Sequence, residues 1–240
     1  MVSITGITAE QARHYYTEKD NYYTKEQGHW YGKGADSLGL RGQVNKEDFE
    51  QILSGRDSKT GELVHAGGEG RSHRAGVDLT FSAPKSVSIL SEVCGDKRVS
   101  VAHDKAVEAT LRHIEDYYSQ ARQTENGHTK RVNTGKLVIA EFPHDTSREL
   151  DPHLHTHGVI MNMTQREDGQ WRALSNEELY NNKMYFGQYY RNELAANLKE
   201  RGYEMESDHR AGVDLYRISK LLGHEDISTT SVMPTTVLQV

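Results

Sequence analysis

Four segments of this chain read as β-strands, and in residues 76–82 apolar and polar residues alternate with the period of two that is typical of a strand with one buried face. The segments are residues 2–7, 76–82, 136–144 and 153–163. A short polar stretch joins the last two segments. We therefore expect these two strands to pair as an antiparallel hairpin.

Other segments repeat their apolar residues every three or four positions, which is the spacing of an amphipathic helix. The glycine-rich residues 28–42 are expected to be loop. Strands, long helices and a hairpin together favour an α+β fold with a central antiparallel β-sheet flanked by helices. The predicted helices are 98–122, 175–201, a short one around Phe49–Leu53, and two that begin at the caps Thr8 and Ser82.

The composition of the chain excludes several classes of protein. The chain has 240 residues, enough for one domain with at most a short appendage. Cys94 is its only cysteine, so a disulfide framework is excluded and a reducing compartment is expected. No apolar run approaches the ~20 residues of a membrane span, and the first residues lack the pattern of a secretion signal. We expect a cytoplasmic protein without membrane insertion.

The net charge of −6 counts against a protein that coats duplex DNA, because such proteins usually carry a strong positive field. It permits a local basic groove. The 13 histidines and 13 tyrosines are more informative, since both residue types take part in catalysis and both stack on bases.

Histidines occupy alternate positions of the segment 151–157, at His153, His155 and His157. In a strand they share one face, with the outer two roughly 13 Å apart at about 3.3 Å per residue. That separation is too large for one ion, because metal–imidazole bonds are about 2.0–2.1 Å long. His144 ends the preceding strand. A hairpin would therefore bring His144, His155 and His157 to one point and leave His153 at the margin.

Three neutral imidazoles would leave open coordination positions and the full charge of a metal ion available to an anion. Phosphate chemistry fits that description. The same ligands also fit zinc hydrolases and cupin-type oxygenases, and a run of solvated strand histidines is the alternative without a metal.

Tyr-Tyr occurs four times, and two of the pairs lie outside the predicted helical patterns of residues 98–122 and 175–201. These are Tyr15–Tyr16 and Tyr22–Tyr23, which lie in a polar segment with little apolar company. Such aromatics more often mark binding than catalysis. A tyrosine nucleophile has an unperturbed pKa of about 10, so it needs a nearby cation or base, and a histidine-bound metal ion could supply that help.

Four ordered motifs resemble those of the conjugative relaxases of the TraI/TrwC type, a branch of the HUH endonucleases. The resemblance covers roughly residues 1–205. The motifs are the two tyrosine pairs, Trp30-Tyr-Gly-Lys-Gly-Ala35, Asp78-Leu-Thr-Phe-Ser-Ala-Pro-Lys-Ser-Val-Ser88, and His144 followed by Asp151-Pro-His-Leu-His-Thr-His157.

The resemblance implies a site- and strand-specific nickase of a plasmid transfer origin. Tyr15 or Tyr16, with Tyr15 preferred, would attack the scissile phosphate, become linked to the DNA 5′ end and release a 3′ hydroxyl. Tyr22 or Tyr23 would serve in a second transfer that rejoins the strand. Asp78 would orient a ligand histidine or accept the tyrosine proton.

The resemblance also implies ligands and partners. His144, His155 and His157 would bind a divalent metal ion, Mg²⁺ or Mn²⁺, with Zn²⁺ as an alternative. The partners would be single-stranded transfer-origin DNA with its nic site and adjacent hairpin, relaxosome accessory proteins and a type IV secretion coupling protein. The protein could travel with the DNA into the recipient cell. Lys85 and Arg148 are candidate DNA contacts in a basic groove.

The chain departs from the family in two places. His153 stands where the family commonly has glutamine, and relaxase domains of this type run well beyond residue 240. From Ala211 the sequence resembles the end of tyrosine recombinases, but Met233 occupies the position of the catalytic tyrosine. We therefore divide the chain into a relaxase domain, 1–207, and a recombinase-like, partly disordered tail, 208–240. A short helix is expected in the tail, with apolar residues Leu215, Ile218, Leu221 and Leu222 and a cap at Gly223.

Two other functions stay open. A truncated relaxase could bind the transfer origin without cutting it. A metal-dependent phosphodiester hydrolase would use water as the nucleophile and tolerate the loss of Tyr15 and Tyr16.

Overall fold

The computed structural model describes residues 1–8, 28–64, 74–147, 149–208 and 215–219. For residues 205–208 and 215–219 it describes the backbone alone. Among the described residues, no helix has the length and hydropathy needed to cross a membrane.

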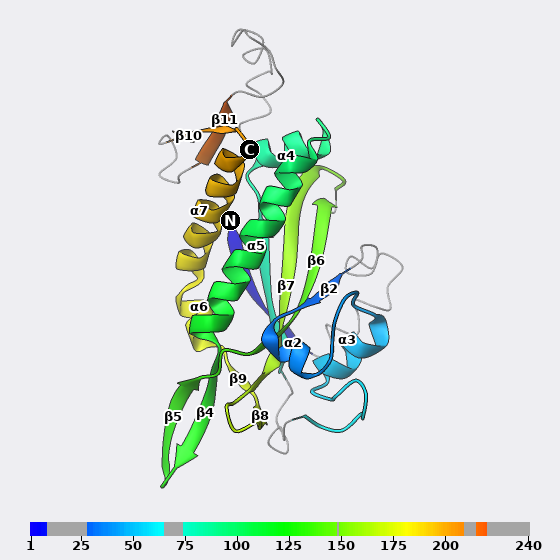
Figure 1. Cartoon of the computed structure of the whole chain (residues 1–240), viewed down its shortest axis with the longest axis vertical. Coiled ribbons are helices and arrows are strands. Elements are labelled where there is room, and N and C mark those ends of the chain that lie inside the picture. Colours follow the sequence, from blue (N-terminus) through cyan, green and yellow to red (C-terminus); the bar gives the residue numbers. More distant parts are fainter. Residues whose placement is uncertain (9–27, 65–73, 148, 209–214, 220–240) are drawn as a thin grey trace.

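A six-stranded antiparallel sheet forms the centre of the molecule (Figure 1), in the order β1-β3-β7-β6-β2 with β8 paired to β7. The four predicted strands are therefore confirmed. The central pair, β6 and β7, is the hairpin expected from the sequence. The strands are β1 (Val2–Thr8), β2 (His29–Tyr31), β3 (Arg74–Ser82), β6 (Leu137–Thr146), β7 (Pro152–Gln165) and β8 (Trp171–Arg172).

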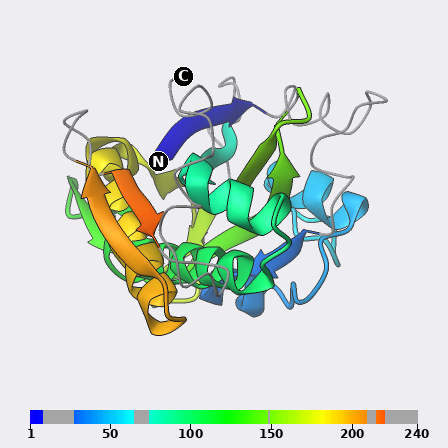
Figure 2. The ribbon, with the colours of Figure 1, turned by 90° about the horizontal axis from the view of Figure 1, so that it is seen from above.

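Helices cover the two faces of the sheet differently. One face packs against α4 (Lys85–Glu92), α5 (Lys97–Tyr118) and α7 (Lys183–Glu200). Among the described elements, α2 (Lys33–Ser37) and α3 (Lys46–Leu53) pack on the other face, near the β2 edge. Figure 2 shows the two groups on opposite sides of the curved sheet. The α+β fold with a central antiparallel sheet flanked by helices is thus confirmed.

Each face has its own apolar core, because alternate residues of a strand point to opposite faces. Leu79, Phe81 and Ile160 face α5 and α7 and are fully buried. Val159 and Met161, on the same strand as Ile160, belong to the second core with α3. This second core ends before the strand positions that carry the histidines.

The prediction of loop for residues 28–42 is wrong, because β2 and α2 lie within them. A buried carboxylate explains the order of this segment. Glu115 Oε1 accepts hydrogen bonds from the backbone N–H of Lys33, at 2.8 Å, and of Leu137, at 2.7 Å. Gly32 makes the tight turn between strand and helix with a φ of 100°, where a side chain would be strained.

Three helix boundaries also differ from the sequence prediction. The helix expected to begin at Ser82 has Pro84 as its N-cap, since Ser82 still belongs to β3. Residues 175–201 form strand β9 (Leu174–Ser175), a short α6 (Glu177–Asn181) and α7, with a break at Asn182.

The third difference adds an element that the sequence reading missed. The helix predicted over 98–122 ends at Tyr118, and a hairpin of β4 (Gln120–Glu125) and β5 (His128–Asn133) follows. Its two turn residues, Asn126 and Gly127, have φ angles of 50° and 77°. An Asn-Gly pair favours this tight turn. This dipeptide is the feature of the sequence from which the hairpin could have been predicted. The hairpin extends beyond the end of α5 in Figure 1.

The described part of the tail is a strand and not the expected helix. β10 (Glu204–Asp208) pairs with β11 (Leu215–Ser219) as an antiparallel hairpin. The prediction of a helix is therefore wrong at Leu215 and Ile218. A helix this short is marginal in water, whereas the neighbouring β10 supplies a pairing partner. Leu221, Leu222 and Gly223 lie outside the described residues.

Candidate metal and nucleic-acid site

The register of the central hairpin brings three histidines together. His144 of β6 lies directly opposite His155 of β7. The ring centroids of His144 and His155 are 5.2 Å apart, those of His144 and His157 5.3 Å, and those of His155 and His157 5.2 Å. The three imidazoles thus form a triangle on the sheet face that does not pack against α5. We call these three residues the histidine triad.

The triad has the dimensions of a metal site. Two imidazoles on one tetrahedral ion have centroids about 5 Å apart, because metal–nitrogen bonds are about 2.0–2.1 Å long. In the described residues, however, no three His, Cys, Asp or Glu side chains already have the arrangement that holds an ion. The spacing of the ring centroids still allows a metal site, because the strand register fixes the backbone while imidazoles turn readily about their side-chain bonds. Coordination would require such a turn.

Two triad members have a fixed proton position. His157 Nδ1 lies 2.8 Å from Asp78 Oδ2 and 3.3 Å from Thr80 Oγ1. A carboxylate only accepts, so Nδ1 carries the proton and donates it to Asp78. His155 Nδ1 donates to the backbone carbonyl of His153 at 2.7 Å. With the proton on Nδ1, the Nε2 atom of each ring is the one that can offer a lone pair to a metal ion.

Burial keeps the imidazoles of His144 and His155 neutral. Desolvation, together with the nearby His157 and His155, lowers the pKa of His144 to about 3. Desolvation likewise lowers the pKa of His155 to about 4. Both groups are therefore neutral at pH 7, as metal ligands must be.

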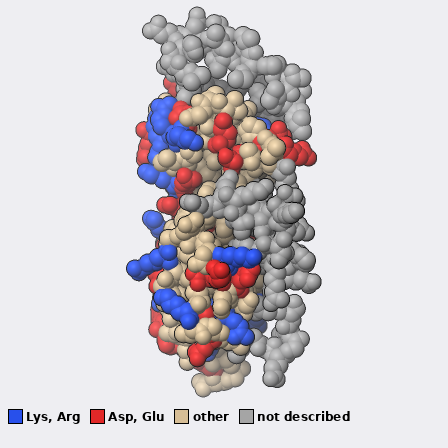
Figure 3. Space-filling view, turned by 90° about the vertical axis from the view of Figure 1, so that its right-hand side faces the viewer, with Lys and Arg blue, Asp and Glu red and all other residues tan. Residues whose placement is uncertain are grey.

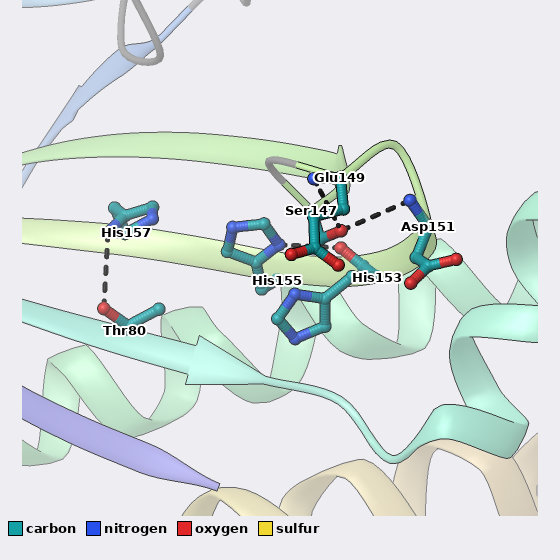
Figure 4. A pocket seen from close by; sticks show the side chains of 7 residues that line it. All are labelled: Thr80, Ser147, Glu149, Asp151, His153, His155 and His157. Carbon is teal, nitrogen blue, oxygen red and sulfur yellow. Dashed lines mark hydrogen bonds between the residues drawn. The ribbon is translucent and has the colours of Figure 1, made fainter. Parts of the chain in front are cut away.

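An open hollow of about 530 Å³ is lined by His155 and His157 of the triad (Figure 4). His153 lines it and stacks on His155, with centroids 4.4 Å apart and planes 17° apart. This imidazole stands beside the triad, at the margin that the sequence suggested. Glu149 and Asp151 also line the hollow, so its outer rim is acidic.

The other predicted site residues divide into two groups. Asp78 is buried and bonded to the triad, as described above. Lys85 is exposed at the start of α4, and its Nζ donates to the carbonyl of Pro152 at 3.0 Å, next to His153. The remaining predicted residues lie outside the described part of the chain; they are Tyr15, Tyr16, Tyr22, Tyr23 and Arg148.

Comparison with known proteins identifies the family. The model of the TrwC relaxase family matches residues 9–226. That range is most of the chain, so the chain belongs to the TrwC relaxase family. It includes the beginning of the tail.

Two curated relatives are conjugation proteins. The multifunctional conjugation protein TraI of Escherichia coli strain K12 is 42% identical over 218 residues, which cover 86% of this chain. A second TraI from Escherichia coli gives the same identity and coverage. The chain spans only 12% of the length of these curated relatives.

Solved relaxase structures have the same fold. A copper-bound structure of conjugative relaxase TrwC with oriT DNA superposes with a TM-score of 0.80 at 42% identity. TrwC complexed with a 27-mer DNA that comprises the recognition hairpin and the cleavage site gives 0.79 at 40% identity. Each match covers 91% of this chain and 75% of the TrwC chain.

The triad predicts stabilisation by divalent metal ions. At a Mn²⁺ concentration of 100 times its Kd, the free energy of unfolding should rise by about 2.7 kcal/mol, because the ion binds the folded site and not the unfolded chain. Thermal unfolding with Mn²⁺ or with EDTA measures this. His144→Ala, His155→Ala and His157→Ala should each abolish the shift, whereas His128→Ala on β5 should keep it. An equal loss in His153→Ala would contradict the assignment of the triad.

Proposed function

We propose that this chain nicks one strand of DNA at a plasmid transfer origin by tyrosine transesterification. The supporting observation is the histidine triad, with His157 held by Asp78, on the sheet of a chain that belongs to the TrwC relaxase family. TrwC itself is known in complex with oriT DNA. The chain spans a small part of the TraI length, so the proposal concerns the nicking step alone.

The nucleophile in this proposal is a tyrosine hydroxyl of the first pair, Tyr15 or Tyr16. Its oxygen attacks the scissile phosphorus and forms a phosphotyrosine bond to the DNA 5′ end. The bond from phosphorus to the 3′ oxygen breaks, and that oxygen leaves with a proton as a 3′ hydroxyl. Tyr22 or Tyr23 would attack in a second transfer, which restores a phosphodiester bond.

A divalent metal ion, Mg²⁺ or Mn²⁺ with Zn²⁺ as the alternative, would be held by His144, His155 and His157. Metal-bound structures of TrwC support a metal ion in the family. When bound, the ion would neutralise negative charge on the scissile phosphate.

Asp78 would keep the imidazole of His157 in its metal-binding form. The carboxylate accepts the Nδ1 proton, so the ring cannot turn over without breaking a buried, charge-assisted hydrogen bond. Loss of such a partner typically costs ten- to a hundredfold in metal affinity or activity. Asp78 is thereby a positioning residue in this account.

A covalent-adduct assay tests the proposed reaction. The chain is mixed with labelled single-stranded oligonucleotides that span candidate transfer origins, including the hairpin, in Mn²⁺ or in EDTA. We expect a protein–DNA band on a denaturing gel in Mn²⁺ only. It should vanish in Tyr15→Phe/Tyr16→Phe and persist in Tyr117→Phe, which alters an exposed tyrosine of another Tyr-Tyr pair.

Other outcomes would contradict the proposal in distinct ways. Cleavage without an adduct, retained in the double variant, would indicate a metal-dependent hydrolase. Salt-dependent binding with neither cleavage nor adduct would indicate a module that only holds the transfer origin.

We propose that the β4–β5 hairpin contributes to DNA binding. Arg122 lies directly opposite Arg131 in its ladder, and both are largely exposed. Like charges in directly opposite positions destabilise a strand pair; an ion pair of Arg131 with Glu177, at 3.0 Å, offsets part of that cost. Lys130 is a third cation of the hairpin and pairs with Glu125 at 3.1 Å. These ion pairs are exposed and therefore weak, so a phosphate could replace the carboxylates. Two-stranded β-ribbons of this kind fit a DNA groove.

Local charge matters here because the chain as a whole is acidic. On the face shown in Figure 3, Lys and Arg side chains are interspersed with Asp and Glu side chains and form no continuous basic field over its described part. Attraction to phosphates would therefore come from small clusters such as the β4–β5 hairpin, with Lys85 and Arg148 as candidate contacts near the triad.

Neutralising the hairpin should weaken DNA binding. In Arg122→Gln/Arg131→Gln, the affinity for a transfer-origin hairpin should fall, and the slope of log affinity against log salt should decrease by about one for each lost phosphate contact. Fluorescence anisotropy between low and physiological salt measures both. Lys199→Gln, an exposed cation on α7, is the control. An unchanged salt slope in the double variant would exclude the hairpin from the interface.

The wider setting is also a proposal. We propose that the chain works in the bacterial cytoplasm with relaxosome accessory proteins and a type IV secretion coupling protein, and enters the recipient cell with the DNA. We place the nicking unit in residues 1–207 and assign no recombinase chemistry to residues 208–240, because Met233 cannot replace a tyrosine nucleophile.

A further inference from the structure

A buried polar contact lies beneath the histidine triad, on the opposite face of the sheet. Thr156 separates His155 and His157 in β7, so its side chain points toward the helices while the two histidines point away from them. Thr156 Oγ1 lies 2.9 Å from Nε2 of His103 on α5. Thr156 and His103 are both buried.

The partners of His103 tie three elements together. Its Nδ1 lies 2.7 Å from the hydroxyl of Tyr190 on α7, which is fully buried. Desolvation lowers the pKa of His103 to about 3, so the ring is neutral and has one donor and one acceptor nitrogen. The hydroxyls of Thr156 and Tyr190 satisfy both nitrogens in either tautomer. Burying an imidazole without such partners costs free energy. The fold therefore favours the arrangement in which His103 contacts both hydroxyls.

This stretch of β7 lies close to the end of its ladder with β3, while its ladder with β6 continues to Pro152. The last β3–β7 pair joins Ser82 to His155. Beyond it, the N–H of Leu154 donates to Ser88 Oγ of α4 at 3.1 Å. On the other side, Gly158 lies so close to α5 that a Cβ atom would be 3.2 Å from Leu111. Side chains of the helices therefore add to strand pairing in holding this backbone, through Ser88 near the end of the β3 ladder and Leu111 beside Gly158.

We propose that the contact between His103 and Thr156 positions the metal-binding histidines. It holds the backbone of β7 at the residue between His155 and His157, and so sets the separation of their imidazoles from the far side of the sheet. His103 is a positioning residue in this account, and it touches neither metal nor DNA. The inference rests on the metal site proposed above.

Two substitutions at Thr156 separate this role from simple packing. Thr156→Val keeps the branched shape and removes the hydroxyl, whereas Thr156→Ser keeps the hydroxyl and removes a methyl group. Titration calorimetry of the 240-residue chain with Mn²⁺, without DNA, gives the metal affinity, and thermal unfolding in EDTA gives the stability. We expect Thr156→Val to lower the Mn²⁺ affinity about tenfold, as loss of an outer partner of a ligand does, and Thr156→Ser to stay within about twofold of the wild type.

Thr164→Val is the matched control. Thr164 is a fully buried threonine of the same strand whose hydroxyl bonds Thr134 at 2.6 Å, far from the triad. It should lose stability and keep its Mn²⁺ affinity. His103→Asn should lower the affinity in the wild type and add little in Thr156→Val, because the two residues act through one contact.

The outcomes distinguish the two proposals. If the wild type binds Mn²⁺ and Thr156→Val binds it equally well, the positioning role is wrong while the metal site stands. If Thr156→Ser or Thr164→Val loses as much affinity as Thr156→Val, packing or general stability is the cause, and the positioning role is again wrong. A wild type that binds neither Mn²⁺ nor Zn²⁺ would contradict both proposals.

Discussion

The register between β6 and β7 is the constraint on which the site depends. It sets His144 opposite His155, and with it the near-equal spacing of the three imidazoles. Side chains of a strand alternate between faces, so a slip by one residue would turn His155 and His157 toward the buried helices and Thr156 toward the open face. The apolar residues farther along the same strands oppose that slip, because Ile160 and Val159 would exchange cores.

The two faces of the sheet have different roles. One face is almost wholly covered by α4, α5 and α7 and supplies most of the buried apolar contacts. Among the described elements, α2 and α3 pack against the other face near the β2 edge, and that face carries the triad and the hollow beside His153. The polar contact of His103 with Thr156 links the two faces, so that the packed side can hold the open side in place.

Much of this arrangement followed from local pattern. The pattern of apolar residues predicted the main strands, and the polar turn after His144 implied the hairpin that brings it to His155. The β4–β5 hairpin was missed because its strands are polar and follow a long helix without interruption, and Asn126–Gly127 was the only strong signal. His103 could not be found either. On the sequence it is one more helical residue, and its role arises from Thr156 and Tyr190, which are distant along the chain and meet it only in the folded core.

Anomalous diffraction from a crystal soaked in Mn²⁺ tests the central claim most directly, because it locates the ion independently of activity. We expect one strong peak at the triad, within bonding distance of imidazole nitrogens of His144, His155 and His157, and with His157 still bonded to Asp78. A peak coordinated by His153 with Glu149 or Asp151 instead, or a fully soaked crystal with no ion at the triad, would contradict it.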